Sequence, residues 1–165
     1  MNAARYVDTL TSRVVDTLKL RGETVATAES LTAGLVTAAL TEVPGASAVV
    51  RGGLVVYATD LKHALAGVDS ALLSAHGAVH SDVAAQLAQG ARTRCDATWG
   101  IGLTGVAGPD PQDGVAPGTV HIGVSGPDGT TTRTITVGGG RAEVRAASVV
   151  AALDLLLDRV KISRK

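Results

Sequence analysis

The chain contains no phenylalanine and only three other aromatic residues, Tyr6, Tyr57 and Trp99. Proteins that bind single-stranded nucleic acid stack successive bases on aromatic side chains, so this class is a poor match. The charge balance agrees, because 15 basic and 15 acidic residues leave a formal net charge of zero. Such a chain lacks the excess of basic residues that binding to a phosphate backbone or an anionic membrane would favour. We therefore expect neither a nucleic-acid partner nor a membrane partner.

Cysteine and long apolar runs are also scarce. The single cysteine, Cys95, excludes an internal disulfide, and the polar start MNAARYVDTLTSR lacks the apolar core of a secretory signal peptide. The longest apolar runs fall well short of the ~20 residues that a membrane-spanning helix needs. These absences favour a cytoplasmic protein. With 45% apolar residues, the 165-residue chain can bury a core of its own, and we expect a single domain over residues 1–165.

Hydrophobic spacing predicts an alternation of helices and strands. Helices are expected over about residues 3–20, 30–42, 82–94 and 141–159, with shorter helical turns in 60–67 and 70–77. Strands are expected over 24–28, 48–58 and 97–105, and a hairpin over 119–126 and 131–137. Gly52 and Gly53 suggest a bulge or bend, Ser81 is a plausible N-cap, and residues 106–118 are too rich in Pro, Gly and Asp for regular structure. This order implies a mixed sheet covered by helices on both sides.

Polar side chains follow three of the predicted strands. Ser30 and Thr32 come after the first, Tyr57 and Lys62 after the second, and Thr104 ends the third. In open α/β sheets ligands bind outside the carboxyl ends of the strands. The convergence of these groups predicts a binding site at that edge of the sheet.

Each of these residues also has a purely structural interpretation. Ser30 is a good N-cap type, although Ala33 stands where the Glu or Gln of a capping box belongs. Lysines on short helices are commonly solvated, and a tyrosine that ends an apolar strand is often packing. A nucleophilic serine needs a base, however. Because the chain shows no convincing Ser-His-Asp order, a desolvated lysine such as Lys62 is the next available activator.

Two apparent motifs do not predict the sites that they suggest. Gly100, Gly102 and Gly105 spell G-x-G-x-x-G, but they lie within a predicted strand and lead into prolines, whereas a dinucleotide fingerprint must open a helix. His76 and His80 are four residues apart in a turn-like context without the glutamate of a zinc protease. We therefore expect no bound cofactor and no metal site. The glycine-rich segment can still cradle a phosphate with its backbone N–H groups.

Six segments together resemble a known family from about residue 8 to residue 160. They are ATAESLTAG, GGLVVYATDLK, HGAVHSDVAAQLAQGA, GLTGVAGPD, PGTVHIGV and GGGRAEVR, in that order. The chain resembles the CinA C-terminal domain family, also called PncC, the nicotinamide mononucleotide amidohydrolases. The resemblance implies a three-layer α/β/α sandwich with a mixed, mostly parallel sheet. It also implies hydrolysis of the carboxamide of nicotinamide mononucleotide to nicotinic acid mononucleotide and ammonia, in pyridine nucleotide salvage.

The resemblance also implies roles for individual residues. The proposed family nucleophile falls on Ser30 and the family lysine on Lys62, while Tyr57 and Thr104 match other polar site positions. In the expected mechanism Lys62, its pKa lowered by burial, takes the proton of Ser30, and Tyr57 orients Lys62 or relays a proton. Backbone N–H groups after Ser30 stabilise the oxyanion. The expected substrate-binding residues are Glu29, Thr32, Gly34, Thr104, Gly105, Ala107, Gly108, Arg141 and Arg145.

Arg141 and Arg145 are expected to hold the 5′-phosphate, since they share a face in the first turns of the last helix; the alternative is that both are solvated surface. The chain departs from the family pattern at Ala33, which replaces a glycine, and in the loop at residues 109–114. Two rival functions therefore stay open, a non-catalytic nucleotide-binding or regulatory module and an amidase for another small carboxamide. A small-molecule nucleotide is the expected partner, and a homodimer is the expected assembly.

Overall fold

The computed structural model of the protein describes residues 3–163. Its centre is a five-stranded sheet in the order β2-β1-β3-β4-β5. β1 (Val25–Glu29) pairs in parallel with both β2 (Val50–Val55) and β3 (Trp99–Gly105). β4 (Thr119–Gly126) and β5 (Gly129–Thr136) add two antiparallel pairings. The expected mixed sheet is confirmed, with parallel pairing on the β2-β1-β3 side and antiparallel pairing on the other.

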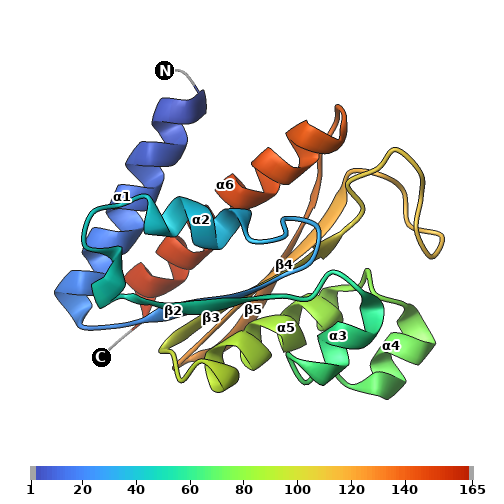
Figure 1. Cartoon of the computed structure of the whole chain (residues 1–165), viewed down its shortest axis with the longest axis horizontal. Helices are drawn as coiled ribbons and strands as arrows, with labels where there is room; N and C mark the ends of the chain where they lie inside the picture. Colours follow the sequence, from blue (N-terminus) through green and yellow to red (C-terminus); the bar gives the residue numbers. More distant parts are fainter. Residues whose placement is uncertain (1–2, 164–165) are drawn as a thin grey trace.

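Helices cover both faces of the sheet, as the α/β/α expectation requires (Figure 1). One face carries α1 (Ala3–Arg21), α2 (Leu35–Thr41) and α6 (Arg141–Ile162). The other carries α3 (Thr59–Ala64), α4 (Ser70–His76) and α5 (Ser81–Arg94). A short 3-10 turn, η1 (Ala46–Ala48), precedes β2. Among the helices of residues 3–163, none is long and apolar enough to cross a membrane.

Two hydrophobic clusters fill the space between the layers. The larger one joins α1, α2 and α6 to the sheet through Leu18, Leu103, Leu153 and other residues that are fully buried. The smaller one, on the opposite face, joins Ala26 and Ala28 of β1 to α5 residues that include Leu87. The sheet is therefore buried on both sides, and the polar ends of its strands are the places where chemistry can reach solvent.

Small residues bring α5 close to the sheet. A side chain at Gly100 would collide with the carbonyl of Ala88, and one at Gly102 with the carbonyl of Ala84. Both glycines lie inside β3, as the sequence analysis expected. These two glycines serve close helix packing, while a side chain at Gly105 would meet the backbone of Thr119 on β4, so packing explains the G-x-G-x-x-G pattern without a dinucleotide.

The β2 bulge is confirmed, while two helix starts were predicted at the wrong residue. The pairing register shifts between Val25 and Ala26, so that Arg51 is the extra residue on β2. The cap of α5 is His80, whose Nδ1 accepts from Asp82 N at 3.2 Å, rather than Ser81. The second helix begins at Leu35 instead of residue 30.

The late start of α2 follows from the alternation of side chains along β1. Residues 25, 27 and 29 share one face of the strand, which directs the Glu29 carboxylate toward the beginning of α2. There it accepts hydrogen bonds from the backbone N–H groups of Gly34, Val36 and Thr37, at 2.9–3.0 Å. Residues 31–34 form a turn, and both Ala33 (φ 48°) and Gly34 (φ 99°) adopt left-handed conformations. The helix is therefore capped by the preceding strand and not by Ser30.

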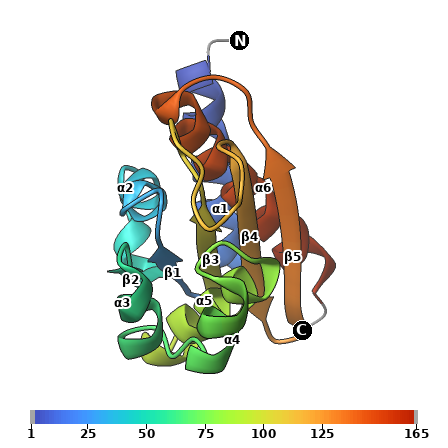
Figure 2. The same cartoon turned by 90° about the vertical axis from the view of Figure 1, so that its right-hand side faces the viewer.

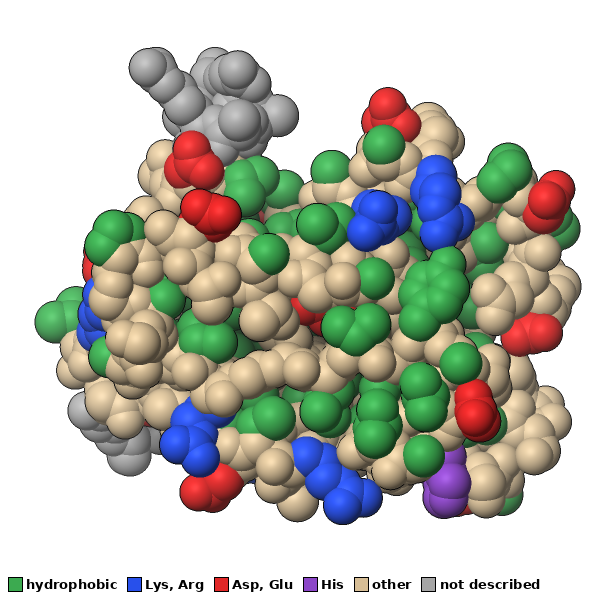
Figure 3. All heavy atoms as spheres, in the orientation of Figure 1, with side chains coloured by type: hydrophobic (Ala, Val, Ile, Leu, Met, Phe, Trp, Pro, Cys, Tyr) green, Lys and Arg blue, Asp and Glu red, His purple; other side chains and the backbone are tan. Residues whose placement is uncertain are grey.

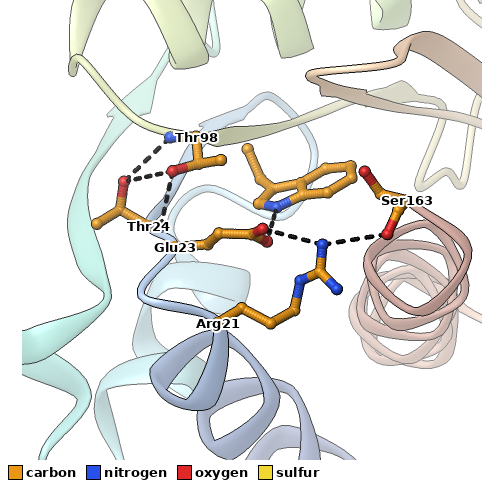
Figure 4. Close-up of polar contacts among 6 residues, drawn as sticks. Arg21, Glu23, Thr24, Thr98 and Ser163 are labelled. Carbon is orange, nitrogen blue, oxygen red and sulfur yellow. Dashed lines mark hydrogen bonds and ion pairs between the residues drawn. The ribbon is translucent and has the colours of Figure 1, made fainter. Parts of the chain in front are cut away.

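A polar cluster lies at the end of the sheet where β1 and β3 begin (Figure 4). Arg21 contacts Glu23 at 3.0 Å and the backbone carbonyl of Ser163 at 3.2 Å. Glu23 also accepts a hydrogen bond from the indole of Trp99 at 2.8 Å. The end of α1 is thus bound both to the end of α6 and to β3.

Candidate active site

A pocket of about 280 Å³ lies at the carboxyl ends of β1, β2 and β3, on the side of the molecule that faces the viewer in Figure 2. Its walls come from the turn after β1, the second residue after β2, the segment before α5, the end of β3 with the loop that follows it, and the start of α6. Seven of the predicted site residues line it: Ser30, Tyr57, Thr104, Gly105, Ala107, Gly108 and Arg141. The expected convergence of the three strand ends is therefore seen in the structure.

Ser30 is the first residue after β1. Its backbone N–H donates to the carbonyl of Leu103 on β3 at 3.1 Å, which fixes its place between the two strands. The residue is only 7% exposed and lines the pocket. Among the described residues its hydroxyl has no hydrogen-bond partner. Ser30 therefore presents an uncommitted oxygen to the pocket.

Lys62 is almost completely buried in α3, with 1% of its surface exposed. Its Nζ donates to the carbonyl oxygens of Val56 at 2.9 Å and Tyr57 at 3.2 Å. Burial lowers the pKa of Lys62 from 10.5 to about 8, against a smaller opposite effect of Asp60. The predicted direction of this pKa shift is confirmed.

Lys62 and Ser30 stand at neighbouring strand ends. The backbone N–H of Val56 donates to the carbonyl of Glu29 at 2.9 Å. Val56, whose carbonyl accepts from Lys62 Nζ, is therefore hydrogen-bonded to the residue that precedes Ser30. Lys62 is not among the residues that line the pocket, and no hydrogen bond among residues 3–163 joins its Nζ to the Ser30 hydroxyl. Catalytic hydrogen bonds are often long in a ligand-free enzyme and tighten when substrate binds.

The Tyr57 phenol makes no hydrogen bond to Lys62 among the described residues. The side chain is 56% exposed, and its hydroxyl accepts a hydrogen bond from Arg141 Nη2 at 2.8 Å. Lys62 is held by the backbone carbonyl of Tyr57 instead. The expected orientation of Lys62 by the phenol is therefore not seen.

Arg141 joins two walls of the pocket. Besides Tyr57, it contacts the carbonyl of Gly108 through Nη1 at 2.9 Å, and Gly108 belongs to the glycine-rich loop after β3. Arg141 is exposed and lines the pocket. This placement is compatible with its expected contact to an anionic group of the ligand.

Arg145 lies elsewhere. Its Nε donates to the carbonyl of Leu31 at 3.0 Å and its Nη2 to the carbonyl of Thr32 at 3.3 Å. It does not line the pocket. The structure thus separates the two arginines that the sequence analysis paired for the phosphate, and it directs Arg145 to the turn after Ser30.

Three other predicted binding residues also lie outside the pocket lining. Glu29 is fully buried, and its carboxylate is occupied by the beginning of α2 and by the hydroxyls of Thr27 and Thr37. Gly34 supplies one of the N–H groups that Glu29 accepts. Thr32 is fully buried as well, and its hydroxyl has no partner among the described residues. These residues therefore belong to the turn after Ser30 or support it, and they do not contact the pocket space.

Thr104 contributes a hydroxyl whose proton is already in use. Its Oγ1 donates to the carbonyl of Ala78 at 2.6 Å, and the side chain is buried at the pocket wall. A hydroxyl has one proton and two lone pairs. Toward a ligand, Thr104 can therefore act only as an acceptor.

Several residues that line the pocket had no role predicted from the sequence. Ala78 and Val79 lie in the HGAVH segment, and Asp110, Pro111 and Gln112 lie in the loop after β3. The HGAVH segment was part of the family resemblance, and its place in the resemblance was the only signal available. On the face of the molecule that Figure 3 shows, in the orientation of Figure 1, basic and acidic side chains are interspersed.

Comparisons with known proteins agree with the fold. Residues 7–160 match the family described as the CinA C-terminal domain. A CinA-like protein from Frankia casuarinae is 52% identical over 149 residues, which are 90% of this chain and 34% of that protein. The chain thus spans about a third of the length of this curated relative.

Solved structures show the same similarity. A competence/damage inducible protein from Agrobacterium tumefaciens is 37% identical with a TM-score of 0.89, covering 92% of this chain and 94% of that one. A competence-damaged protein (CinA) superfamily protein from Escherichia coli is 30% identical with a TM-score of 0.90, covering 95% and 92%.

Proposed function

Because the chain belongs to the CinA C-terminal domain family, we propose that it hydrolyses the carboxamide of nicotinamide mononucleotide to nicotinic acid mononucleotide and ammonia. This reaction would place it in pyridine nucleotide salvage. The observation that carries the proposal is the uncommitted Ser30 hydroxyl in a pocket at the end of β1, with a buried lysine of pKa about 8 held at the end of the neighbouring strand β2. A serine becomes nucleophilic when a neighbouring base takes its proton, and a lysine with a lowered pKa can be that base.

The environment of Lys62 suits a neutral amine. A neutral amine has two N–H groups and one lone pair, and the two carbonyls of Val56 and Tyr57 accept both protons. The lone pair then stays free to accept a proton from Ser30. An arginine in this place would stay protonated and could not do so.

The chemical step forms a bond between Ser30 Oγ and the carboxamide carbon and breaks the bond from that carbon to nitrogen. The proton that Lys62 removes from Ser30 passes to the leaving nitrogen, which departs as ammonia. Water then attacks the ester at Ser30 and releases the carboxylate. The N–H groups of Leu31 and Thr32, which follow Ser30 in the chain, are the donors we assign to the oxyanion. One such donor typically contributes about 10²–10³ in rate.

The remaining pocket residues fit a carboxamide nucleotide. Thr104 can accept a hydrogen bond from a carboxamide NH₂, but it has no proton to offer to the carboxylate of the product. Arg141 lies at the pocket and can exchange a contact with Tyr57 or Gly108 for a bidentate contact with phosphate. A volume of about 280 Å³ lies just below the usual range of small-molecule pockets, roughly 300–1,000 Å³. It suits one mononucleotide better than a dinucleotide.

The test is an ammonia assay on the purified protein with nicotinamide mononucleotide, its dephosphorylated riboside and a panel of other small amides. We expect ammonia from the mononucleotide at the highest kcat/KM. Binding of the mononucleotide without ammonia would instead support a nucleotide-binding module. Ammonia from a different amide alone would support an amidase with another substrate.

A further inference from the structure

Two backbone N–H groups directly after Ser30 have no acceptor among the described residues. They belong to Leu31 and Thr32. The N–H groups on either side are taken, because Ser30 N donates to Leu103 O and Ala33 N donates to Ser30 O. Leu31 lines the pocket together with Ser30. Two adjacent unpaired donors beside a candidate nucleophile form a potential anion-binding pair.

Arg145 binds the backbone carbonyl groups of this turn. It comes from the start of α6, and its Nε and Nη2 donate to two successive carbonyls, Leu31 O at 3.0 Å and Thr32 O at 3.3 Å. The contact spans 114 residues of sequence and is partly buried. A planar guanidinium with fixed donor directions holds two carbonyls in one arrangement, which a lysine cannot do.

Peptide geometry transmits this contact to the N–H groups. In a trans peptide unit the C=O of one residue and the N–H of the next point in opposite directions. Holding Leu31 O toward α6 therefore directs Thr32 N–H away from α6. The peptide that carries Leu31 N–H is fixed in the same way, because its carbonyl on Ser30 accepts from Ala33 N at 3.0 Å. The direction of each free N–H is thus fixed by a hydrogen bond to the carbonyl oxygen of the same peptide unit.

We propose that Arg145 is a positioning residue that orients the backbone N–H groups of Leu31 and Thr32 for the oxyanion formed when Ser30 attacks. This inference rests on the proposed acyl transfer at Ser30. Arg145 does not line the pocket, and its Nε and Nη2 donate to the backbone carbonyls of Leu31 and Thr32. Its loss should therefore slow the chemical step and leave the binding of substrate nearly unchanged.

The experiment compares Arg145→Met, Arg145→Lys and the control Arg133→Met, whose arginine makes a surface ion pair with Asp158 at 3.4 Å. We expect kcat for nicotinamide mononucleotide to fall about 10²-fold in both Arg145 variants, as for loss of one oxyanion donor. KM should change by less than about three-fold, since ground-state binding is kept. The control should behave as wild type. If Arg145→Met does not fold, Arg145→Lys carries the test, because it keeps the stem and the charge.

A fluorophosphonate probe separates this inference from the choice of substrate. Ser30 Oγ forms a bond to phosphorus, fluoride leaves, and the proton of Ser30 goes to Lys62. The phosphoryl oxygen needs the same N–H groups, so labelling should slow by a similar factor in the Arg145 variants. Wild-type labelling without ammonia release would remove the proposed substrate and keep the inference.

Three outcomes would overturn the role of Arg145. The first is a raised KM with unchanged kcat, which would mean that Arg145 binds the phosphate. The second is wild-type kcat and wild-type labelling in both variants. The third is a wild-type protein that the probe does not label at Ser30, which would remove the nucleophile together with its positioning residue.

Discussion

Replacing Lys62 with methionine should stabilise the fold at neutral pH while it abolishes ammonia release. The buried amine has a pKa of about 8 in the folded protein and 10.5 as its ordinary value. Between these two pH values the unfolded chain binds more protons than the folded one, so the free energy of unfolding rises with pH through this window. Below pH 8 the amine is charged in both states, and burying this charge lowers the free energy of unfolding by about 3 kcal/mol. With 1% of the side chain exposed, solvent screening reduces it little.

Methionine removes this cost and also two hydrogen bonds. The carbonyls of Val56 and Tyr57 lose their partner, which costs about 1 kcal/mol each. At pH 7 the Lys62→Met protein should therefore be more stable than wild type by about 1 kcal/mol. At pH 10 most of the charge cost has gone, and the variant should be less stable by about 1 kcal/mol.

The assay is urea unfolding of wild type, Lys62→Met and the surface control Lys161→Met at pH 7 and pH 10. The difference between Lys62→Met and wild type should change by about 2–3 kcal/mol between the two pH values, and the control should show no such change. Over the same range, wild-type kcat/KM should rise with pH and level off above about 8, where the amine is neutral. A stability difference that is equal at both pH values would refute the lowered pKa and, with it, Lys62 as a neutral base.

Two further predictions concern the pocket entrance and the Ser30 turn. Arg141→Met should raise KM for the mononucleotide ten-fold or more, about 1.4 kcal/mol, and hardly affect the riboside; equal effects in a kinetic comparison would mean that Arg141 only holds Tyr57 and the loop. Glu29→Gln should lower the free energy of unfolding by about 3 kcal/mol, because an NH₂ group replaces a carboxylate oxygen that accepts backbone N–H groups. Urea unfolding against the exposed control Glu42→Gln checks this, and equal losses in both variants would contradict it.

Much of the fold follows from local patterns in the sequence. Apolar spacing predicted the order of helices and strands, and the paired glycines predicted the bulge in β2. The convergence of Ser30, Tyr57 and Thr104 followed from a general rule about parallel strands. These features depend on residues that lie close together in the chain or on the direction of the strands.

The errors arise where a polar contact between elements, or burial of a polar side chain, decides the local structure. The helix predicted from residue 30 begins at Leu35, because Glu29 reaches from β1 to cap it and the chain turns before the helix starts. Arg145 shares a helix face with Arg141, yet the packing of α6 directs it to a turn 114 residues away. Hydrophobic periodicity carries no information about such polar contacts. The near-complete burial of Lys62 is a third example, since a short helix with a lysine is usually solvated.

The central claim is that Ser30 is the nucleophile of an amidohydrolase. The most direct measurement is ammonia release from nicotinamide mononucleotide by wild type and Ser30→Ala, together with thermal unfolding of both. The Ser30 hydroxyl has no partner among the described residues, so its removal should change stability by less than about 1 kcal/mol. The account predicts a variant that is folded as wild type and releases no ammonia above background. A folded Ser30→Ala protein with near wild-type turnover would contradict it.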